Sequence, residues 1–201
     1  KDISPDELKK LIKNISVVLA HIFNLSLAKG IVPDDMKIAK VIPIYKSGPK
    51  NILSNYRPIS LLPSFSKILE KLVCNRLTAF LDKNKILWQH QYGFRKQHNT
   101  THPIIQLLNY VATNNDKPTK DSIIRVFLEI SKAFDTVPHS ALIQKLDYYG
   151  IRGIANQWFQ SYLSNRKQYV SYMSHNISVF YTKTMLPQMI NLRKTPPLVF
   201  S

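Results

Sequence analysis

The feature of this sequence that most restricts its fold is a short, nearly continuous apolar run that contains a carboxylate near its end. The run, Ile123–Ile130, is rich in β-branched side chains and is shorter than most helices. Those properties predict a β-strand that is buried on both faces. A carboxylate such as Glu129 is costly to bury, and it is usually tolerated because it binds a metal ion, pairs with a cation or faces solvent. Taken alone, Glu129 is expected to face solvent or to form an ion pair more often than to bind a metal.

Amphipathic helices are predicted on both sides of this run in the sequence. The first has a complete set of boundary signals, since Ser4 can cap it, Pro5 suits its first position and Gly30 can end it. Between these residues, apolar side chains recur at three- and four-residue spacing, which indicates one apolar face. The same spacing predicts further helices at about 64–83, 104–111, 139–149 and 154–163.

The remaining strand signals are shorter. Ile38–Lys46 has strand composition, but Pro43 lacks a backbone donor and therefore favours the edge of a sheet. The stretch 55–58 is expected to be irregular, and 114–120 is the best hinge candidate. Residues 168–173 and 177–183 alternate like the two arms of a β-hairpin. The last eighteen residues show no period, and no regular element is expected there.

The charge balance points to polyanionic partners. Lys and Arg number 28 against 12 Asp and Glu, which gives a formal net charge of +16. Basic and aromatic residues also alternate in Tyr45-Lys46, in Tyr56-Arg57 and in Tyr92-Gly93-Phe94-Arg95-Lys96. Cationic groups meet phosphates and aromatic rings stack on bases, so three such pairs in a basic chain favour nucleic-acid binding over a merely solvated surface.

Several other chemistries lack the residues that they need. Cys74 is the single cysteine, which excludes an internal disulfide. His98 and His102 are four residues apart with no third ligand near them in the sequence, so a zinc site is not expected. Neither a glycine-rich phosphate loop nor the clustered acidic residues of a metal-dependent hydrolase can be found. The longest apolar stretch, 15–27, is interrupted by polar residues, so neither a transmembrane segment nor a membrane partner is expected.

Three longer motifs occur in a fixed order and spacing, and shorter ones follow them. The longer motifs are Asn55-Tyr56-Arg57-Pro58-Ile59-Ser60-Leu61-Leu62, Gln91-Tyr92-Gly93-Phe94-Arg95 and Ser131-Lys132-Ala133-Phe134-Asp135-Thr136-Val137. The shorter ones are Tyr149-Gly150-Ile151-Arg152-Gly153, Trp158-Phe159 and Ser161-Tyr162-Leu163-Ser164-Asn165-Arg166-Lys167-Gln168. In this order and spacing they closely resemble the reverse transcriptases of LINE-type (non-LTR) retrotransposons, and the resemblance covers residues 5 to 188.

The resemblance implies an α+β fold of the right-hand polymerase type. It places an N-terminal helical segment at 1–37, the fingers region at 38–118 and the beginning of the palm, with an incomplete palm sheet, at 119–201. The implied chemistry is addition of deoxynucleotides to a DNA primer on an RNA template, so the partners are template, primer or hybrid duplex and deoxynucleoside triphosphate. Two Mg²⁺ ions held by palm aspartates serve this reaction in the family.

The resemblance also assigns roles to individual residues. Glu129 stands where the family has its first metal-binding aspartate, and it is therefore the expected metal ligand. Phe134 matches the aromatic residue that selects deoxyribose. Nucleotide or template contacts are expected from Lys46, Arg57, Arg95, Lys96, Pro187 and Gln188.

The departures from the family pattern predict an inactive fragment. The extra methylene of Glu129 moves its carboxylate by roughly 1 Å, and misplacement on that scale costs on the order of a hundredfold in rate. Met189 replaces the expected glycine after Pro187-Gln188, and the strand-turn-strand that carries two adjacent aspartates is missing. A non-catalytic nucleic-acid-binding module and a decayed transposon relic without function are the alternatives.

Overall fold

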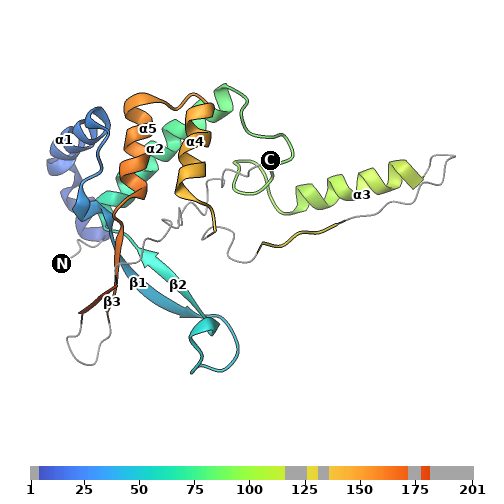
Figure 1. Cartoon of the computed structure of the whole chain (residues 1–201), viewed down its shortest axis with the longest axis horizontal. Coiled ribbons are helices and arrows are strands. Elements are labelled where there is room, and N and C mark those ends of the chain that lie inside the picture. Colours follow the sequence, from blue (N-terminus) through green and yellow to red (C-terminus); the bar gives the residue numbers. More distant parts are fainter. Residues whose placement is uncertain (1–4, 116–125, 131–135, 172–177, 182–201) are drawn as a thin grey trace. The chain divides into compact units, whose positions relative to one another are not determined.

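The computed structural model describes residues 5–115, 126–130, 136–171 and 178–181 (Figure 1). They belong to two compact units. Unit 1 comprises Lys1–Val73 and Phe134–Gln188, and unit 2 comprises Cys74–Ala133 and Met189–Ser201. The division of the chain after residues 37 and 118, proposed above from the motifs, remains a prediction.

Both units contain helices, and unit 1 adds a sheet, which agrees with the expected α+β class. All five predicted helices are confirmed, with small differences at their ends. The helices are α1 (Pro5–Lys29), α2 (Ser64–Lys83), α3 (Thr101–Asn115), α4 (His139–Tyr148) and α5 (Gly153–Leu163), with short 3-10 turns η1 (Asp34–Lys37) and η2 (Leu53–Asn55). The strands are β1 (Ile38–Tyr45), β2 (Tyr56–Leu61), β3 (Lys167–Ser171) and β4 (Ser178–Tyr181).

The strands of unit 1 form one sheet in the order β2-β1-β3-β4. β1 is antiparallel to β2 and parallel to β3, and β3 and β4 form the predicted antiparallel hairpin. The prediction that β1 is an edge strand is therefore wrong for the strand as a whole. The reason for that prediction, the missing backbone donor of Pro43, still applies at Pro43 itself. The ladder between β1 and β3 ends at Val41, two residues before it. Beyond that point, within the described residues, β1 pairs with β2 alone, so no donor is needed there on the side of β3.

β2 was not expected, since the stretch 55–58 reads as irregular. Pro58 and the polar residues beside it weaken the strand signal. The structure places Pro58 directly opposite Pro43, so two residues without backbone donors share one register position. The Lys46 N–H donates to the Asn55 carbonyl at 2.8 Å, and hydrogen-bonded and non-hydrogen-bonded pairs alternate along an antiparallel ladder. Pro43 and Pro58 therefore form a non-hydrogen-bonded pair, in which neither residue has to donate to the other. Pairing with β1 makes β2 a strand despite its composition.

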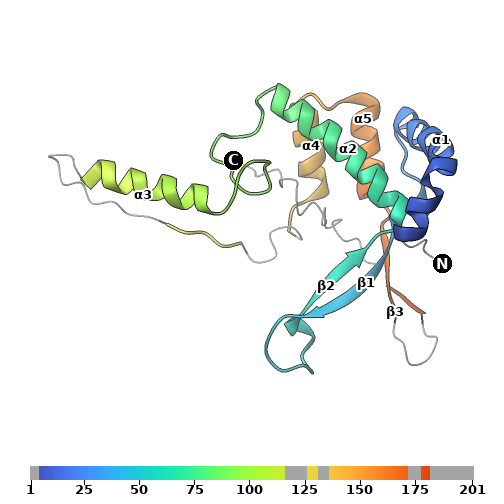
Figure 2. The same ribbon diagram turned by 180° about the vertical axis from the view of Figure 1, so that it is seen from behind.

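Helix α5 lies at the centre of the core of unit 1. Two rings on its inner face, Trp158 and Tyr162, stack with a centroid distance of 5.4 Å and an interplanar angle of 9°. Helices α1 and α4 both pack against α5, as the two opposite views show (Figures 1 and 2). The buried apolar side chains of this core are Leu19, Phe23, Val32, Ala39, Val41, Leu69, Leu142, Leu146, Ile151, Trp158, Phe159, Tyr162 and Leu163.

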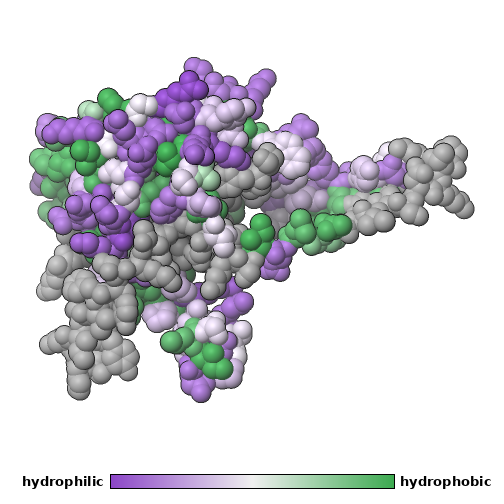
Figure 3. All heavy atoms as spheres, in the orientation of Figure 1, coloured by the Kyte–Doolittle hydropathy of each residue, from purple (hydrophilic) through white to green (hydrophobic). Residues whose placement is uncertain are grey.

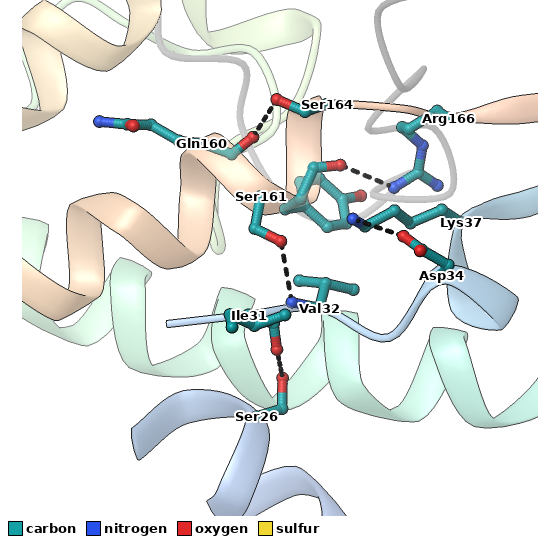
Figure 4. Close-up of polar contacts among 10 residues, drawn as sticks. Ser26, Ile31, Val32, Asp34, Lys37, Gln160, Ser161, Ser164 and Arg166 are labelled. Carbon is teal, nitrogen blue, oxygen red and sulfur yellow. Dashed lines mark hydrogen bonds and ion pairs between the residues drawn. The ribbon is translucent and has the colours of Figure 1, made fainter. Parts of the chain in front are cut away.

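A strap of chain between α1 and β1 is held to α5 by polar contacts. The indole Nε1 of Trp158 donates to Ser26 Oγ at 3.0 Å, and Ser26 Oγ donates to the Ile31 carbonyl at 2.6 Å. The backbone N–H of Val32 donates to Ser161 Oγ at 3.0 Å, across more than a hundred residues of sequence (Figure 4). These bonds fix the point from which β1 starts. They also satisfy polar groups that the core would otherwise leave without partners.

A buried charged network joins α2, α5 and the start of β3. The side chain of Arg166 is 7% exposed, and its Nη2 lies 3.8 Å from Glu70 Oε1. Its Nη1 donates to the Tyr162 carbonyl at 3.2 Å, and its guanidinium lies 4.6 Å from the Tyr162 ring centroid. The Tyr162 hydroxyl donates to Glu70 Oε1 at 2.5 Å. Burial raises the pKa of Glu70 against the opposing effects of Tyr162 and Arg166, and burial followed by the charge of Glu70 raises the pKa of Tyr162 well above its ordinary value.

The prediction of a strand buried on both faces is wrong for residues 126–130. They form no strand, and Phe127 and Leu128 are 82% and 88% exposed. Among the described residues, no strand pairs with this segment, and an isolated extended segment has neither a ladder nor a covered face. The rest of the predicted strand, most of the hinge candidate and the last eighteen residues lie outside the described part of the chain.

The structure does not support the expectation that the chain lacks a segment able to span a membrane. By length and composition, Lys10–Lys29 in α1 is a segment that could cross a membrane, and only 17% of it is buried. Core helices of soluble proteins and N-terminal signal sequences meet the same criteria.

Replacing Arg166 tests the buried network. Arg166→Met leaves Glu70 inside unit 1 without its cation, and we expect a loss of about 2–3 kcal/mol in the free energy of unfolding, somewhat less than for a fully buried pair because Glu70 is partly exposed. Urea unfolding in a Trp88→Phe background measures it, because the fluorescence then reports Trp158 of unit 1. The matched control is Arg152→Met, which removes an exposed pair with Asp147 and should change stability by less than about 0.5 kcal/mol. Equal losses in the two variants would contradict this account.

The raised pKa of Glu70 predicts how the stability of unit 1 changes with pH. Because its pKa is raised in the folded state, the stability that its protonated form supplies is present at low pH and is lost as pH rises through the folded pKa. Glu70→Gln keeps an oxygen for the Tyr162 hydroxyl and does not titrate. Thermal unfolding between about pH 4 and pH 7 should therefore show a smaller decline of stability with pH in Glu70→Gln than in the parent chain. Parallel curves would exclude Glu70 as the source.

Candidate nucleic-acid interface

The far end of the β1–β2 hairpin combines two aromatic-basic pairs. Tyr45 and Tyr56 occupy opposite register positions, and their rings pack edge to face with a centroid distance of 5.6 Å. The residues that follow them, Lys46 and Arg57, are both exposed. The sequence identified these two pairs separately, and strand pairing brings them to one place.

The loop that joins the two strands is held by hydrogen bonds to its own backbone. The Tyr45 hydroxyl donates to the Gly48 carbonyl, and the Tyr56 hydroxyl donates to the Lys50 carbonyl at 2.8 Å. The Asn55 side-chain amide donates to the Pro49 carbonyl, also at 2.8 Å. Gly48 has φ +91°, and a Cβ there would come within 2.7 Å of Asn55 Nδ2, so only glycine fits this turn.

These contacts leave a cationic surface at the hairpin end. The loop carries a third basic residue, Lys50, whose Nζ lies 5.8 Å from the Tyr45 ring centroid. The space-filling view shows hydrophilic and hydrophobic atoms side by side on this loop (Figure 3). The motifs did not identify Lys50, although its place directly after Ser47-Gly48-Pro49, which is a turn sequence, was a usable signal. Three cations beside two tyrosines suit a phosphate backbone whose bases or sugars contact the rings.

The third aromatic-basic pair belongs to unit 2, in the loop between α2 and α3. Arg95 is half-buried, and its Nη1 donates to the Trp88 carbonyl at 3.2 Å. Lys96 is exposed, and its carbonyl lies 2.9 Å from His98 Nδ1. Phe94 has φ +61°, a conformation that is uncommon for a bulky residue.

Histidine and tyrosine rings hold the start of α3 against this loop. The rings of His98 and His102 have a centroid distance of 5.7 Å, and the ring of Tyr92 lies 5.7 Å from that of His98. Asn99 Oδ1 accepts from the backbone N–H groups of Thr101 and His102 at 3.0 and 3.1 Å, and this side chain therefore caps the start of α3. The histidines therefore have packing and hydrogen-bonding roles in this loop.

The predicted site residues fall into separate groups. Lys46 and Arg57 come together in unit 1, whereas Arg95 and Lys96 lie in the loop of unit 2. Glu129 is exposed within the unpaired segment 126–130. Phe134, Pro187 and Gln188 lie outside the described residues.

The described residues do not fit a two-metal site. Over the ranges that the structure describes, no three His, Cys, Asp or Glu side chains gather in a way that could hold a metal ion. Glu129 is a single carboxylate on an exposed segment, and Mg²⁺ sites use several carboxylates or phosphates. We therefore derive no catalytic step through Mg²⁺ from this geometry.

Comparison with known proteins agrees with the motifs. Residues 44–191 match the family model described as reverse transcriptase (RNA-dependent DNA polymerase). The "Probable RNA-directed DNA polymerase from transposon BS" of Drosophila melanogaster is 35% identical over 80% of this chain and 17% of its own length. The "RNA-directed DNA polymerase from mobile element jockey" of the same species is 40% identical over 63% of this chain and 14% of its own length.

A second mobile element jockey polymerase, from Drosophila funebris, is 33% identical over 85% of this chain. This chain thus spans less than a fifth of the length of these relatives. The family match covers well over half of the chain and includes the β1–β2 hairpin end and the loop at 88–100. The chain belongs to the reverse transcriptase family, and its relatives place it among the LINE-type retrotransposon enzymes.

Proposed function

We propose that this chain is the fingers and the beginning of the palm of a LINE-type reverse transcriptase, and that it binds template-primer nucleic acid without extending it. The observation that carries the binding is the end of the β1–β2 hairpin, where the exposed Lys46 and Arg57 follow two packed tyrosines and Lys50 lies near the Tyr45 ring, on a loop held by its own hydrogen bonds. RNA template, DNA primer or hybrid duplex and deoxynucleoside triphosphate are the proposed partners. Arg95 and Lys96 supply a second set of phosphate contacts from unit 2.

We assign no DNA polymerisation to this chain because its aspartates and glutamates do not occur at the positions that the family's reaction requires. Apart from Glu129, the family's chemistry needs two adjacent aspartates on a strand-turn-strand. Asp34-Asp35 is the single Asp-Asp pair in the sequence, and it lies in η1 before β1. Asp34 there pairs with the buried Lys37 at 3.0 Å, so it has a structural partner.

Salt dependence tests the binding. Affinity for an RNA–DNA hybrid should fall steeply between about 50 and 300 mM salt, because lysine and arginine displace counterions condensed on the phosphates. Arg57→Ala and Lys46→Ala should each weaken binding and lower the slope of log affinity against log salt by about one. Lys71→Ala on the exposed face of α2 is the control and should leave the slope unchanged. Undetectable or salt-independent binding would refute the proposal.

A primer-extension assay tests the proposal that this chain does not polymerise DNA. We expect no labelled product with Mg²⁺ or Mn²⁺, and none from Glu129→Asp, because restoring one carboxylate does not supply the aspartate pair. The comparison separates the two departures from the family pattern. Product from the Asp variant alone would identify Glu129 as the only defect, and product from the parent chain would overturn the proposal entirely. A known reverse transcriptase on the same template is the positive control.

A further inference from the structure

The part of unit 2 that runs from the end of α2 through α3 has an uneven charge composition. Residues 83–115 contain lysines, arginine and three histidines, but no aspartate and no glutamate. A stretch of this kind attracts a polyanion, because no carboxylate of its own repels phosphates or neutralises its cations. The basic residues are Lys83, Lys85, Arg95 and Lys96, and the histidines are His90, His98 and His102.

The loop that joins α2 to α3 in this stretch (Figure 1) exposes a large aromatic ring. The side chain of Trp88 is 61% exposed, and its ring packs edge to face against the ring of His90 with a centroid distance of 4.9 Å. A single exposed apolar side chain is ordinary on a protein surface. An exposed indole among cations, in a stretch without carboxylates, is instead typical of a ring that stacks on a nucleic-acid base.

The backbone of Trp88 is fixed by hydrogen bonds that do not involve its ring. Its carbonyl accepts from the Gln91 N–H at 3.1 Å and from Arg95 Nη1 at 3.2 Å. Gln91 itself is only 5% exposed, so this turn of the loop is anchored in unit 2. The same bond brings the guanidinium of Arg95 to the backbone of Trp88. A cation therefore lies beside the exposed indole, and replacement of the indole leaves these backbone contacts in place.

An exposed ring distinguishes unpaired from paired strands. Neighbouring base pairs cover the faces of the bases in a duplex or hybrid, whereas an unpaired base has a free face for stacking. The salt-dependent binding proposed for the end of the β1–β2 hairpin uses phosphates, which paired and unpaired strands both present. The Trp88 indole offers a contact that only an unpaired base can complete.

We propose that Trp88 stacks on an unpaired base, so that the α2–α3 loop binds a single-stranded stretch of the RNA template. This inference rests on the proposed nucleic-acid binding and adds which form of the strand unit 2 binds and which side chain selects it. Arg95 and Lys96 contact the phosphates of the same strand. Because every base has a flat face, the contact shows little preference for sequence.

Two probes test the role of Trp88, single-stranded oligouridylate of about twelve nucleotides and a blunt RNA–DNA hybrid. Trp88→Ala should weaken oligouridylate binding by about fivefold or more, and should leave the salt dependence and the hybrid affinity unchanged because no charge is lost. Trp88→Phe keeps a ring and should retain most of the affinity. The matched control is Tyr148→Ala, because Tyr148 is 79% exposed but follows Asp147 in α4 of unit 1. This control should change neither affinity.

Tryptophan fluorescence gives a second readout that a merely structural role would not change. The other tryptophan of the chain, Trp158, is 3% exposed, so a base can stack on Trp88 alone. Oligouridylate should therefore quench the fluorescence of the parent chain more than the hybrid does. This quenching should disappear in Trp88→Phe, in which the remaining signal comes from the buried Trp158.

The two probes also separate failure of this inference from failure of the proposed function. Salt-dependent hybrid binding, together with oligouridylate binding that Trp88→Ala weakens no more than Tyr148→Ala does, would overturn the role of Trp88 and leave the proposed function standing. Equal losses for both probes in Trp88→Ala would overturn it as well, because they indicate a structural role in the loop. Trp88-dependent oligouridylate binding without hybrid binding would support the stacking and overturn the role of the hairpin end. Binding of neither probe would overturn both.

Discussion

The contacts that the buried Arg166 guanidinium makes with Glu70 and Tyr162 are the interaction on which unit 1 depends. The guanidinium stands between the end of α5 and the start of β3, and its partners Glu70 and Tyr162 lie on α2 and α5. Because β3 runs parallel to β1, fixing the start of β3 also fixes the end of β1 nearest the helices. Ser26 and Ser161 hold the strap that leads into the same end of β1. The direction of the β1–β2 hairpin is thus set by polar contacts inside an otherwise apolar core.

The hairpin end gains its order from its own hydrogen bonds, because it lies beyond the ladder with β3. Its tyrosine hydroxyls and the amide of Asn55 satisfy loop carbonyls, and Gly48 permits the close turn. No basic side chain is needed for that structure. Lys46 and Arg57 therefore remain exposed on a backbone that is already hydrogen-bonded, and such prior ordering lowers the entropy lost when a phosphate chain binds.

The helices could be predicted because local periodicity determines them. The features that depend on the pairing of distant strands could not be predicted from the sequence. The helices follow from three- and four-residue spacing and end signals such as Gly30, which need no distant partner. β2 was missed because Pro58 weakens its local signal, and its opposition to Pro43 can be seen only in the register. The aromatic-basic pairs were identified one by one, but their convergence required that same register. Lys50 was missed because it belongs to no motif.

The strand predicted at residues 126–130 was also wrong because it depended on pairing with other strands. This matters for metal binding by Glu129, which lies in the segment. A β-branched segment becomes a buried strand only when neighbouring strands supply hydrogen bonds and cover its faces. In the proposed reverse transcriptase architecture, the strands that would cover Phe127 and Leu128 also carry the paired aspartates that Glu129 lacks. Burial of this segment and assembly of the acidic site would then be one event. Among the described residues no strand pairs with this segment, and Glu129 is exposed there. In the proposed architecture, covering the segment would therefore be a condition for metal binding at this carboxylate.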